Sequence, residues 1–411
     1  MRQAWMPDLH GKRLLIAEEA LKDFVGHWYE YVKAVAELSA AQGAEVEIVG
    51  HSRATPALLE TGLHPLFPRT LWDGDYRHGL PGWRKLGLPR HNWLVFRTMR
   101  RFLKDHGPFA VTFVPTVVGH HIWAWRLLSL LYPRQIGRLV LLIRNNAASY
   151  APGSTTPVFD RAARLLKWGL RGFASDIDAG RVVFATDSAR LAEEYRALAG
   201  LTPVVFPSPR VAPPATPSKP RDPAAPLLFA CLGPARFEKG IDVLQRAIAL
   251  YLADPVAPPA RFAIQWPTPI EDAAGAPYPP APALIASGRV DVLTEPLDSA
   301  DYDALLGRTD CMVLPYRRSS YFARISGVAV EAVTGGIPVI TTRDTWTADL
   351  IANSGAGIVV DDGDAAGLAA AMAGLARDYP RWRAAAEAAR AGAQAAHSGG
   401  EFLEKLWGTQ G

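Results

Sequence analysis

The sequence predicts an α/β fold with two Rossmann-like domains, each a doubly wound parallel sheet, facing each other across a cleft. Short apolar runs alternate with amphipathic helical stretches along most of the chain, and a proline-rich stretch interrupts this alternation near the middle. The length, 411 residues, also exceeds what one hydrophobic core usually serves.

The first domain is expected to span residues 1–205. Its opening run, KRLLIAEEA, is followed by a glycine-containing turn at residues 25–27, a helix over 29–42 and a second apolar run, AEVEIVG. Strand, helix and strand in this order form a β-α-β unit. Further strands are predicted from FAVTFVP, RLVLLIR and RVVFAT, with helical stretches between them.

Residues 206–226 are predicted to be an interdomain linker, because eight prolines in 21 residues exclude a helix or an inner strand. The second domain is expected over 227–380. Its predicted strands are PLLFACLG, RFAIQW, VDVLTEPL, CMVLPY, IPVITT and GIVVDD. Residues 381–411 are predicted to form helices that pack back on the first domain.

Composition indicates an ordinary soluble protein, with 49% apolar and 20% charged residues. Cys231 and Cys311 both lie in apolar runs, which favours buried thiols in a reducing compartment over a disulfide framework or a metal site. No stretch reads as a signal peptide or a membrane span, so we expect a cytoplasmic location.

The charge is unevenly distributed. Residues 1–205 carry 26 Lys and Arg against 18 Asp and Glu, whereas the remainder carries 18 against 22. The segment 77–104 holds eight cations and no acid, interleaved with aromatic residues. Such a segment can meet nucleic acid, anionic lipid headgroups or a phosphorylated acceptor, or it can be a solvated helix face.

Several site classes are not supported by motifs. The glycine clusters lack the spacing and context of a dinucleotide-binding loop, and there is no Walker lysine motif, GxSxG elbow or HExxH. Asp-x-Asp triplets occur near turns and helix starts, where aspartate usually caps backbone amides. We therefore expect no metal site.

Two features of the second half indicate an anion site. The run FACLGPARFEKGID places Gly233, Arg236 and Lys239 after a strand and before a helix, where cations suit a diphosphate. In YFARISGVAVEAVTGGIPVI, Ser326 is a natural N-cap and Gly327 allows close approach of a ligand to the helix N-terminus. The alternative interpretation of FACLGPARFEKGID is a surface loop whose cations bind no ligand.

Glu331 lies about one turn into the same short helix, among apolar neighbours. From there a carboxylate can accept hydrogen bonds from a ribose whose phosphate lies at Ser326 and Gly327. An exposed helix glutamate is the alternative, but a buried acid needs a partner.

At these residues the chain resembles retaining glycosyltransferases of the GT-B fold, in the large family-4 group of bacterial polysaccharide and glycolipid enzymes. GPARFEKG resembles the donor-phosphate loop of that family, and SGVAVEAVTGGIPVI resembles its E-x7-E segment. VGHWYEYVKAVAELSAAQGAEVEIVG is similar to the glycine loop and helix of the family's first domain. Two positions depart from the pattern. Pro234 replaces an arginine, and Ala323 replaces the first glutamate.

The resemblance implies a transfer from a nucleoside-diphosphate sugar with retention of configuration, with no cofactor or metal, to a saccharide or lipid-linked acceptor. Catalytic residues would be Arg236, Lys239 and His120, with His121 as an alternative to His120. The donor site would comprise Gly233, Ser326, Gly327, Glu331, Arg324, Tyr321 and, near the base, Leu297. Gly26 and His27 would border the acceptor and the donor phosphate.

The basic segment 77–104 favours a lipid-linked or otherwise anionic acceptor at the membrane face, with a peripheral membrane contact, and we expect no nucleic-acid partner. Because Ala323 replaces a carboxylate, an inactive sugar-nucleotide-binding protein is an alternative. A GT-B epimerase is a second alternative, which Ala323 weakens, and no lysine typical of a pyridoxal-dependent phosphorylase is identifiable.

Overall fold

The computed structural model describes residues 7–24, 27–70, 84–119, 121–151, 153–209, 222, 225–266, 269–272, 274–295, 297–352 and 355–408. The chain divides into two compact units. Unit 1 comprises residues 1–211 and 397–411, and unit 2 comprises residues 212–396. Most of the predicted linker lies outside the described residues.

Unit 1 is built on a seven-stranded parallel sheet with the order β3-β2-β1-β4-β5-β8-β9. Its strands are β1 (Arg13–Ala17), β2 (Glu45–His51), β3 (His64–Phe67), β4 (Val111–Val114), β5 (Arg138–Ile143), β8 (Val182–Thr186) and β9 (Val204–Val205). A small antiparallel pair, β6 (Ala148–Ser149) and β7 (Val158–Phe159), is separate from the sheet. The short strands β3 and β9 were not predicted, since neither shows a long apolar run.

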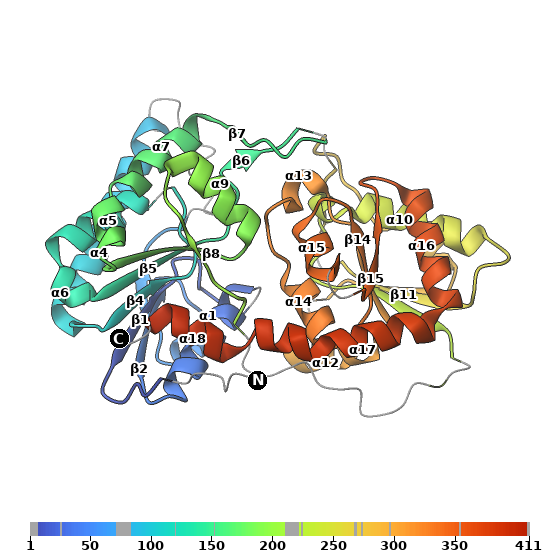
Figure 1. Cartoon of the computed structure of the whole chain (residues 1–411), viewed down its shortest axis with the longest axis horizontal. Helices are drawn as coiled ribbons and strands as arrows, with labels where there is room; N and C mark the ends of the chain where they lie inside the picture. The colour runs from blue at the N-terminus through green and yellow to red at the C-terminus, as the bar shows by residue number, and fades with distance from the viewer. Residues whose placement is uncertain are drawn as a thin grey trace. The chain divides into compact units, whose positions relative to one another are not determined.

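Helices cover both faces of this sheet (Figure 1). α1 (His27–Ala40) and α18 (Gly399–Trp407) cover one face, where Tyr31, Val35 and Phe402 pack on Phe113 and its neighbours. The other face carries α4 (Arg84–His106), α5 (Ile122–Leu131), α7 (Arg161–Arg171) and α9 (Ala189–Ala199). The shorter helices are α2 (Pro56–Leu59), α6 (Pro133–Ile136) and α8 (Ala174–Asp178).

Unit 2 is built on a six-stranded parallel sheet with the order β12-β11-β10-β13-β14-β15. Its strands are β10 (Leu227–Cys231), β11 (Ala260–Gln265), β12 (Val290–Leu293), β13 (Cys311–Leu314), β14 (Val339–Thr342) and β15 (Gly357–Val360). Five of them lie within predicted runs, and β11 begins one residue before its run, RFAIQW. Both cysteines are free and buried, as predicted.

Helices cover both faces of the second sheet as well (Figure 1). α10 (Ile241–Ala253) and α16 (Ala365–Arg377) pack on one face, and α12 (Ser299–Arg308), α14 (Gly327–Thr334) and α15 (Trp346–Ala352) pack on the other. Short elements complete the unit: η1 (Phe237–Lys239), α11 (Pro282–Ala286) and α13 (Arg318–Tyr321). The predicted pair of doubly wound parallel sheets is confirmed.

The C-terminal helices are divided between the units. α17 (Tyr379–Ala396) packs on α14 in unit 2, where the side chain of Gln394 donates to the carbonyl of Thr334 at 2.8 Å. α18 instead inserts Phe402 and Leu406 into the core of unit 1. The boundary therefore falls at 396, later than the predicted 380, because the apolar contacts of α17 are made with unit 2. In the described part of the chain, no helix is long and apolar enough to cross a membrane.

Each sheet has one point where the direction of strand addition reverses. In unit 1 this switch point lies between β1 and β4, and in unit 2 it lies between β10 and β13. Open parallel sheets bind ligands at the carboxyl ends of the strands that flank such a point. The functional site should therefore be sought in the loops that follow these four strands.

Candidate functional site

At the unit 2 switch point, the loop after β10 brings Lys239 against the backbone of Gly233. Gly233 has a φ of +78°, and its N–H donates to the side chain of Gln265 at 2.6 Å. A Cβ atom at Gly233 would lie 2.9 Å from Nζ of Lys239 and 3.3 Å from the side chain of Val328 in the first turn of α14. The predicted cation and the predicted helix N-terminus therefore meet at this glycine.

Gly240 fixes the position of Lys239 from the other side. It has a φ of +68°, and a Cβ atom there would lie 1.9 Å from the carbonyl oxygen of Pro315, which follows β13. Only glycine combines this conformation with so close an approach. The sequence Lys239-Gly240 thus holds the loop after β10 tightly against the loop after β13.

The ammonium of Lys239 lies in an environment that disfavours its charge. Burial lowers its pKa to about 8, and the nearby guanidinium groups of Arg236 and Arg324 also lower it. Cys231 and Glu238 raise the pKa, but by less than burial lowers it. Among the described residues, Lys239 makes no ion pair with a carboxylate. An anion bound beside Gly233 would supply the missing countercharge.

Glu238 links the two arginines of the site. Its Oε1 lies 3.5 Å from Arg236 and 3.2 Å from Arg324. The side chain of Arg236 remains half-exposed, so it can turn toward a ligand while Glu238 keeps it near. Sequence reasoning missed this role of Glu238, although the residue stands between two predicted site residues.

The N-terminus of α14 forms as predicted. Oγ of Ser326 accepts the N–H of Ala329 at 3.2 Å and lies 3.2 Å from the hydroxyl of Tyr316. Ser326 is buried whereas Gly327 is exposed. The N–H groups of the first helical turn have no acceptor within the helix, so they and the helix dipole can attract an anion.

Glu331 lies one turn further along α14 and is half-buried. The hydroxyl of Tyr302, on α12, donates to its Oε2. This protein partner was not predicted, because Tyr302 and Glu331 are far apart in the sequence. Tyr302 fixes the orientation of the carboxylate beside the anion site.

The segment before α14 forms an aromatic wall. Tyr321 is buried and stacks on Tyr316 with ring centroids 4.1 Å apart, and the Arg324 guanidinium lies 5.3 Å from the Tyr321 ring centroid. Burial raises the pKa of Tyr321 to about 12, so it stays neutral. Ala323 is fully buried, so the side chain that replaces the family's carboxylate is part of the core. Leu297 is partly buried and packs on the α12 and α14 face of the sheet.

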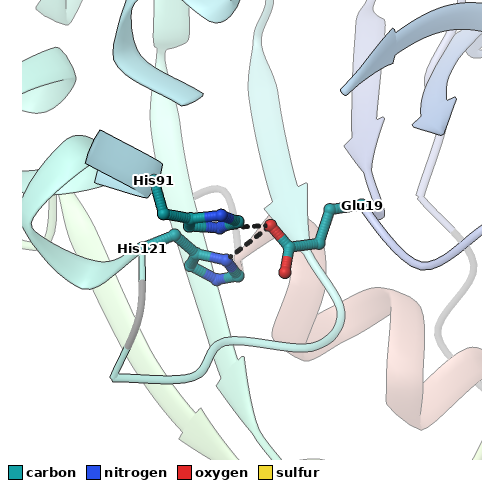
Figure 2. Close-up of side chains that lie close together, drawn as sticks. All are labelled: Glu19, His91 and His121. Atoms are coloured by element: carbon teal, nitrogen blue, oxygen red, sulfur yellow. Dashed lines mark hydrogen bonds and ion pairs between the residues drawn. The ribbon is translucent and has the colours of Figure 1, made fainter. Parts of the chain in front are cut away.

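At the unit 1 switch point lies a buried cluster of Glu19, His91 and His121, shown in Figure 2. Nε2 of His91, from α4, lies 2.9 Å from Oε2 of Glu19, and Nδ1 of His121, before α5, lies 3.2 Å from the same oxygen. Burial alone would raise the pKa of Glu19, but His121 and His91 hold it well below the ordinary value. The cluster therefore links the end of β1 to α4 and to the start of α5.

Glu18, its neighbour, is in the opposite situation. Burial raises its pKa to about 7, although the N–H of Ala20 donates to Oε1 at 3.0 Å and the hydroxyl of Thr116 lies nearby. Within the described part of the chain, neither Oε2 of Glu18 nor the Thr116 hydroxyl has a hydrogen bond of normal geometry. Glu18, Glu19 and His91 were not predicted as site residues.

Three predicted site residues are not placed. Gly26 and His120 lie outside the described residues, and of His27 only the backbone, at the start of α1, is described. His121, the predicted alternative to His120, is the one that contacts Glu19.

The second unit matches a known family. Residues 227–378 match the model of the glycosyl transferases group 1 family. The match covers the loop from Gly233 to Lys239 and all of α14. The predicted family resemblance is confirmed at this level.

Solved structures of similar fold extend over both units. The chain resembles sucrose-phosphate synthase from Thermosynechococcus elongatus with a TM-score of 0.63 at 15% identity, over 94% of this chain and 95% of that one. HepE from Anabaena, in complex with UDP, gives 0.63 at 14% identity, over 96% and 98%. WaaG, a glycosyltransferase involved in lipopolysaccharide biosynthesis, gives 0.56 at 15% identity, over 93% and 95%. The chain therefore has the GT-B fold. No curated protein sequence matches it.

Proposed function

We propose that this protein is a retaining glycosyltransferase that takes a sugar from a nucleoside-diphosphate sugar. The observation that carries the proposal is the convergence of Lys239, Gly233 and the N-terminus of α14, with Glu331 one turn further on. A diphosphate would lie at the first three and the ribose hydroxyls would donate to Glu331. HepE structures with UDP and with UDP-glucose make UDP-sugars the first donors to test.

The chemical step would be driven by electrostatics. As the bond from the sugar to the diphosphate breaks, negative charge grows on the leaving phosphate, and fixed cations with helix-end amides stabilise that charge. Lys239, Arg236 and the first turn of α14 would do this without a metal. Burial lowers the pKa of Lys239, which makes the ammonium easier to deprotonate in the absence of a ligand. A bound diphosphate would favour the protonated form, because its negative charge stabilises the ammonium.

The first unit would bind the acceptor, a saccharide or a lipid-linked saccharide of bacterial surface polysaccharide or glycolipid synthesis. An acceptor hydroxyl would attack from the face that the diphosphate leaves, and the leaving phosphate could take its proton. His120, next to His121, would line the sugar, and Gly26 and His27 would border the acceptor. The Glu19 cluster would then hold the loop before α5 in place.

A second candidate function is sugar-nucleotide binding without transfer. The observation that favours it is the full burial of Ala323 where the resemblance places a carboxylate. Arg324 and Tyr321, beside this position, would then only contact the sugar.

One experiment separates these functions. The protein is mixed in turn with UDP-, GDP- and dTDP-sugars, and both thermal stabilisation and release of the free nucleotide are measured. Stabilisation with slow nucleotide release supports the transferase, because such enzymes can hydrolyse donors when no acceptor is present. Stabilisation without release or transfer to any saccharide supports the binding protein. No stabilisation by any nucleotide contradicts both.

A further inference from the structure

Three neighbouring helices of unit 1 expose an unusual number of large apolar side chains. α5 packs against both α4 and α7 on the same face of the sheet (Figure 1). In the described part of the chain, half of the exposed large apolar side chains lie on these helices: Trp93, Trp123, Leu127, Leu130, Leu131, Leu165 and Trp168. Trp168 is 73% exposed and Leu131 is 57% exposed, so neither belongs to the core.

The same helices carry cations and almost no acids. Asp105 is the only acidic residue in their sequences. Eight arginines and lysines on them are exposed: Arg90, Arg97, Arg100, Arg101, Lys104, Arg161, Arg164 and Arg171. On α4 Arg90 and Arg97 lie on either side of Trp93 in the sequence, and on α7 the exposed cations flank Leu165 and Trp168. We call these exposed apolar and basic side chains the α4-α5-α7 surface.

This combination selects one kind of partner. Nucleic acid would use the cations and stack on tryptophan, but exposed leucines on α5 and α7 have no role toward phosphates or bases. A bilayer with anionic headgroups uses all three kinds of side chain, since leucines insert, tryptophans lie at the headgroup level, and cations meet the lipid phosphates. Exposed apolar side chains gathered on neighbouring helices in this number indicate an interaction site.

We propose that the α4-α5-α7 surface docks unit 1 on an anionic lipid bilayer. This inference rests on the proposed function, since it would bring the protein to a lipid-linked acceptor. The proposed surface is larger than the membrane contact predicted from the sequence, which comprised the basic segment 77–104 alone. The described part of the basic segment, 84–104, supplies α4 with its cations, whereas most of the inserting side chains come from α5 and α7.

The test is sedimentation of the full chain with two kinds of vesicle, one of pure phosphatidylcholine and one of equal parts phosphatidylcholine and phosphatidylglycerol. We expect binding to the anionic vesicles only, weakened by added salt. A triple variant, Arg97→Gln, Arg100→Gln and Arg164→Gln, should bind about a hundredfold more weakly. A matched variant, Arg53→Gln, Arg308→Gln and Arg377→Gln, changes the charge equally and should bind like the unmodified protein.

The apolar part is tested by Leu131→Ser with Trp168→Ser, against Leu250→Ser with Ile285→Ser as a control on unit 2. Only the first pair should weaken vesicle binding, by about tenfold or more. Equal binding of both vesicle types, no binding, or equal losses in surface and control variants would overturn the proposal. So would loss of self-association in the surface variants with unchanged vesicle binding, because a second copy would then be the occupant.

Nucleotide release from a soluble donor is measured on the same variants. It should be unchanged, because none of the substituted residues lies at the unit 2 switch point. Vesicle binding without any donor binding would leave the surface assigned and refute the proposed function, so the two failures are distinguishable.

Discussion

The two switch points have the same topology and opposite chemistry. In unit 1 the loops after β1 and β4, together with α4, bring together two buried carboxylates and two histidines, and Glu19 is satisfied by its histidine partners. In unit 2 the loops after β10 and β13 bring together cations and a helix N-terminus, and the pKa of Lys239 is lowered because burial leaves its charge poorly compensated. We expect a paired cluster to stabilise the fold and poorly compensated cations to bind an anionic ligand.

Lys239→Ala should have the largest effect on activity and so distinguishes the two switch points most clearly. We expect sugar transfer or donor hydrolysis to fall by about 10²–10³-fold, because a group that stabilises the leaving phosphate is lost. The stability of the protein without ligand should fall little or rise, since a buried charge is removed. Steady-state kinetics and urea unfolding measure the two effects. Lys33→Ala, an exposed lysine on α1, is the control, and equal activity in both variants would refute the role of Lys239.

Glu19→Ala should have the reverse effect. It removes the carboxylate that two buried histidines share, and each buried hydrogen-bonding group left unsatisfied costs about 1–3 kcal/mol of unfolding free energy. Urea unfolding measures the loss, with Glu37→Ala on the exposed side of α1 for comparison. A stability like that of the Glu37→Ala variant would show that the cluster does not hold unit 1 together.

Glu18→Gln should change how stability depends on pH. Because the pKa of Glu18 is raised from 4.5 to about 7, the folded state keeps a proton that the unfolded state loses, and stability falls as the pH rises through this range. The variant should lack this contribution and be more stable above pH 7 by on the order of 2 kcal/mol. Unfolding curves at several pH values test this, and parallel profiles for both proteins would contradict it.

Tyr302→Phe should have the smallest effect. It removes the hydroxyl that orients Glu331 and keeps the ring, so nucleotide affinity should fall by about fivefold, or roughly 1 kcal/mol. Calorimetric titration with the nucleotide that stabilises the protein measures the change. Tyr278→Phe, on the other face of the unit 2 sheet, is the control, and equal affinities in both variants would mean that Tyr302 does not orient a ligand group.

The sequence predicted the unit 2 site better than the unit 1 site for a physical reason. Gly233, Lys239, Ser326 and Glu331 lie in two short segments whose spacing follows from a loop and one helix turn. Local rules of capping and strand-to-helix turns are enough to place them. Both sheets were predictable in the same way, from apolar runs of strand length.

The unit 1 cluster depends on contacts that local patterns do not contain. Glu19 and His91 are 72 residues apart in the sequence and meet only through the tertiary packing of α4. The Tyr302 bond to Glu331 is of the same kind, with partners on separate helices. The role of α17 in unit 2 also depended on tertiary packing, since its sequence shows only a helix.

The most direct test of the central claim is the proton uptake that accompanies nucleotide binding. Calorimetric titration with UDP, or with whichever nucleoside diphosphate stabilises the protein, is repeated at pH 8 in buffers of different ionisation enthalpy. Since the pKa of Lys239 is lowered to about 8, binding of a diphosphate beside it should take up about half a proton, and Lys239→Met should abolish the uptake. Binding with no proton uptake, or with the same uptake in the Lys239→Met variant, would contradict the claim that Lys239 is the countercharge of the bound diphosphate.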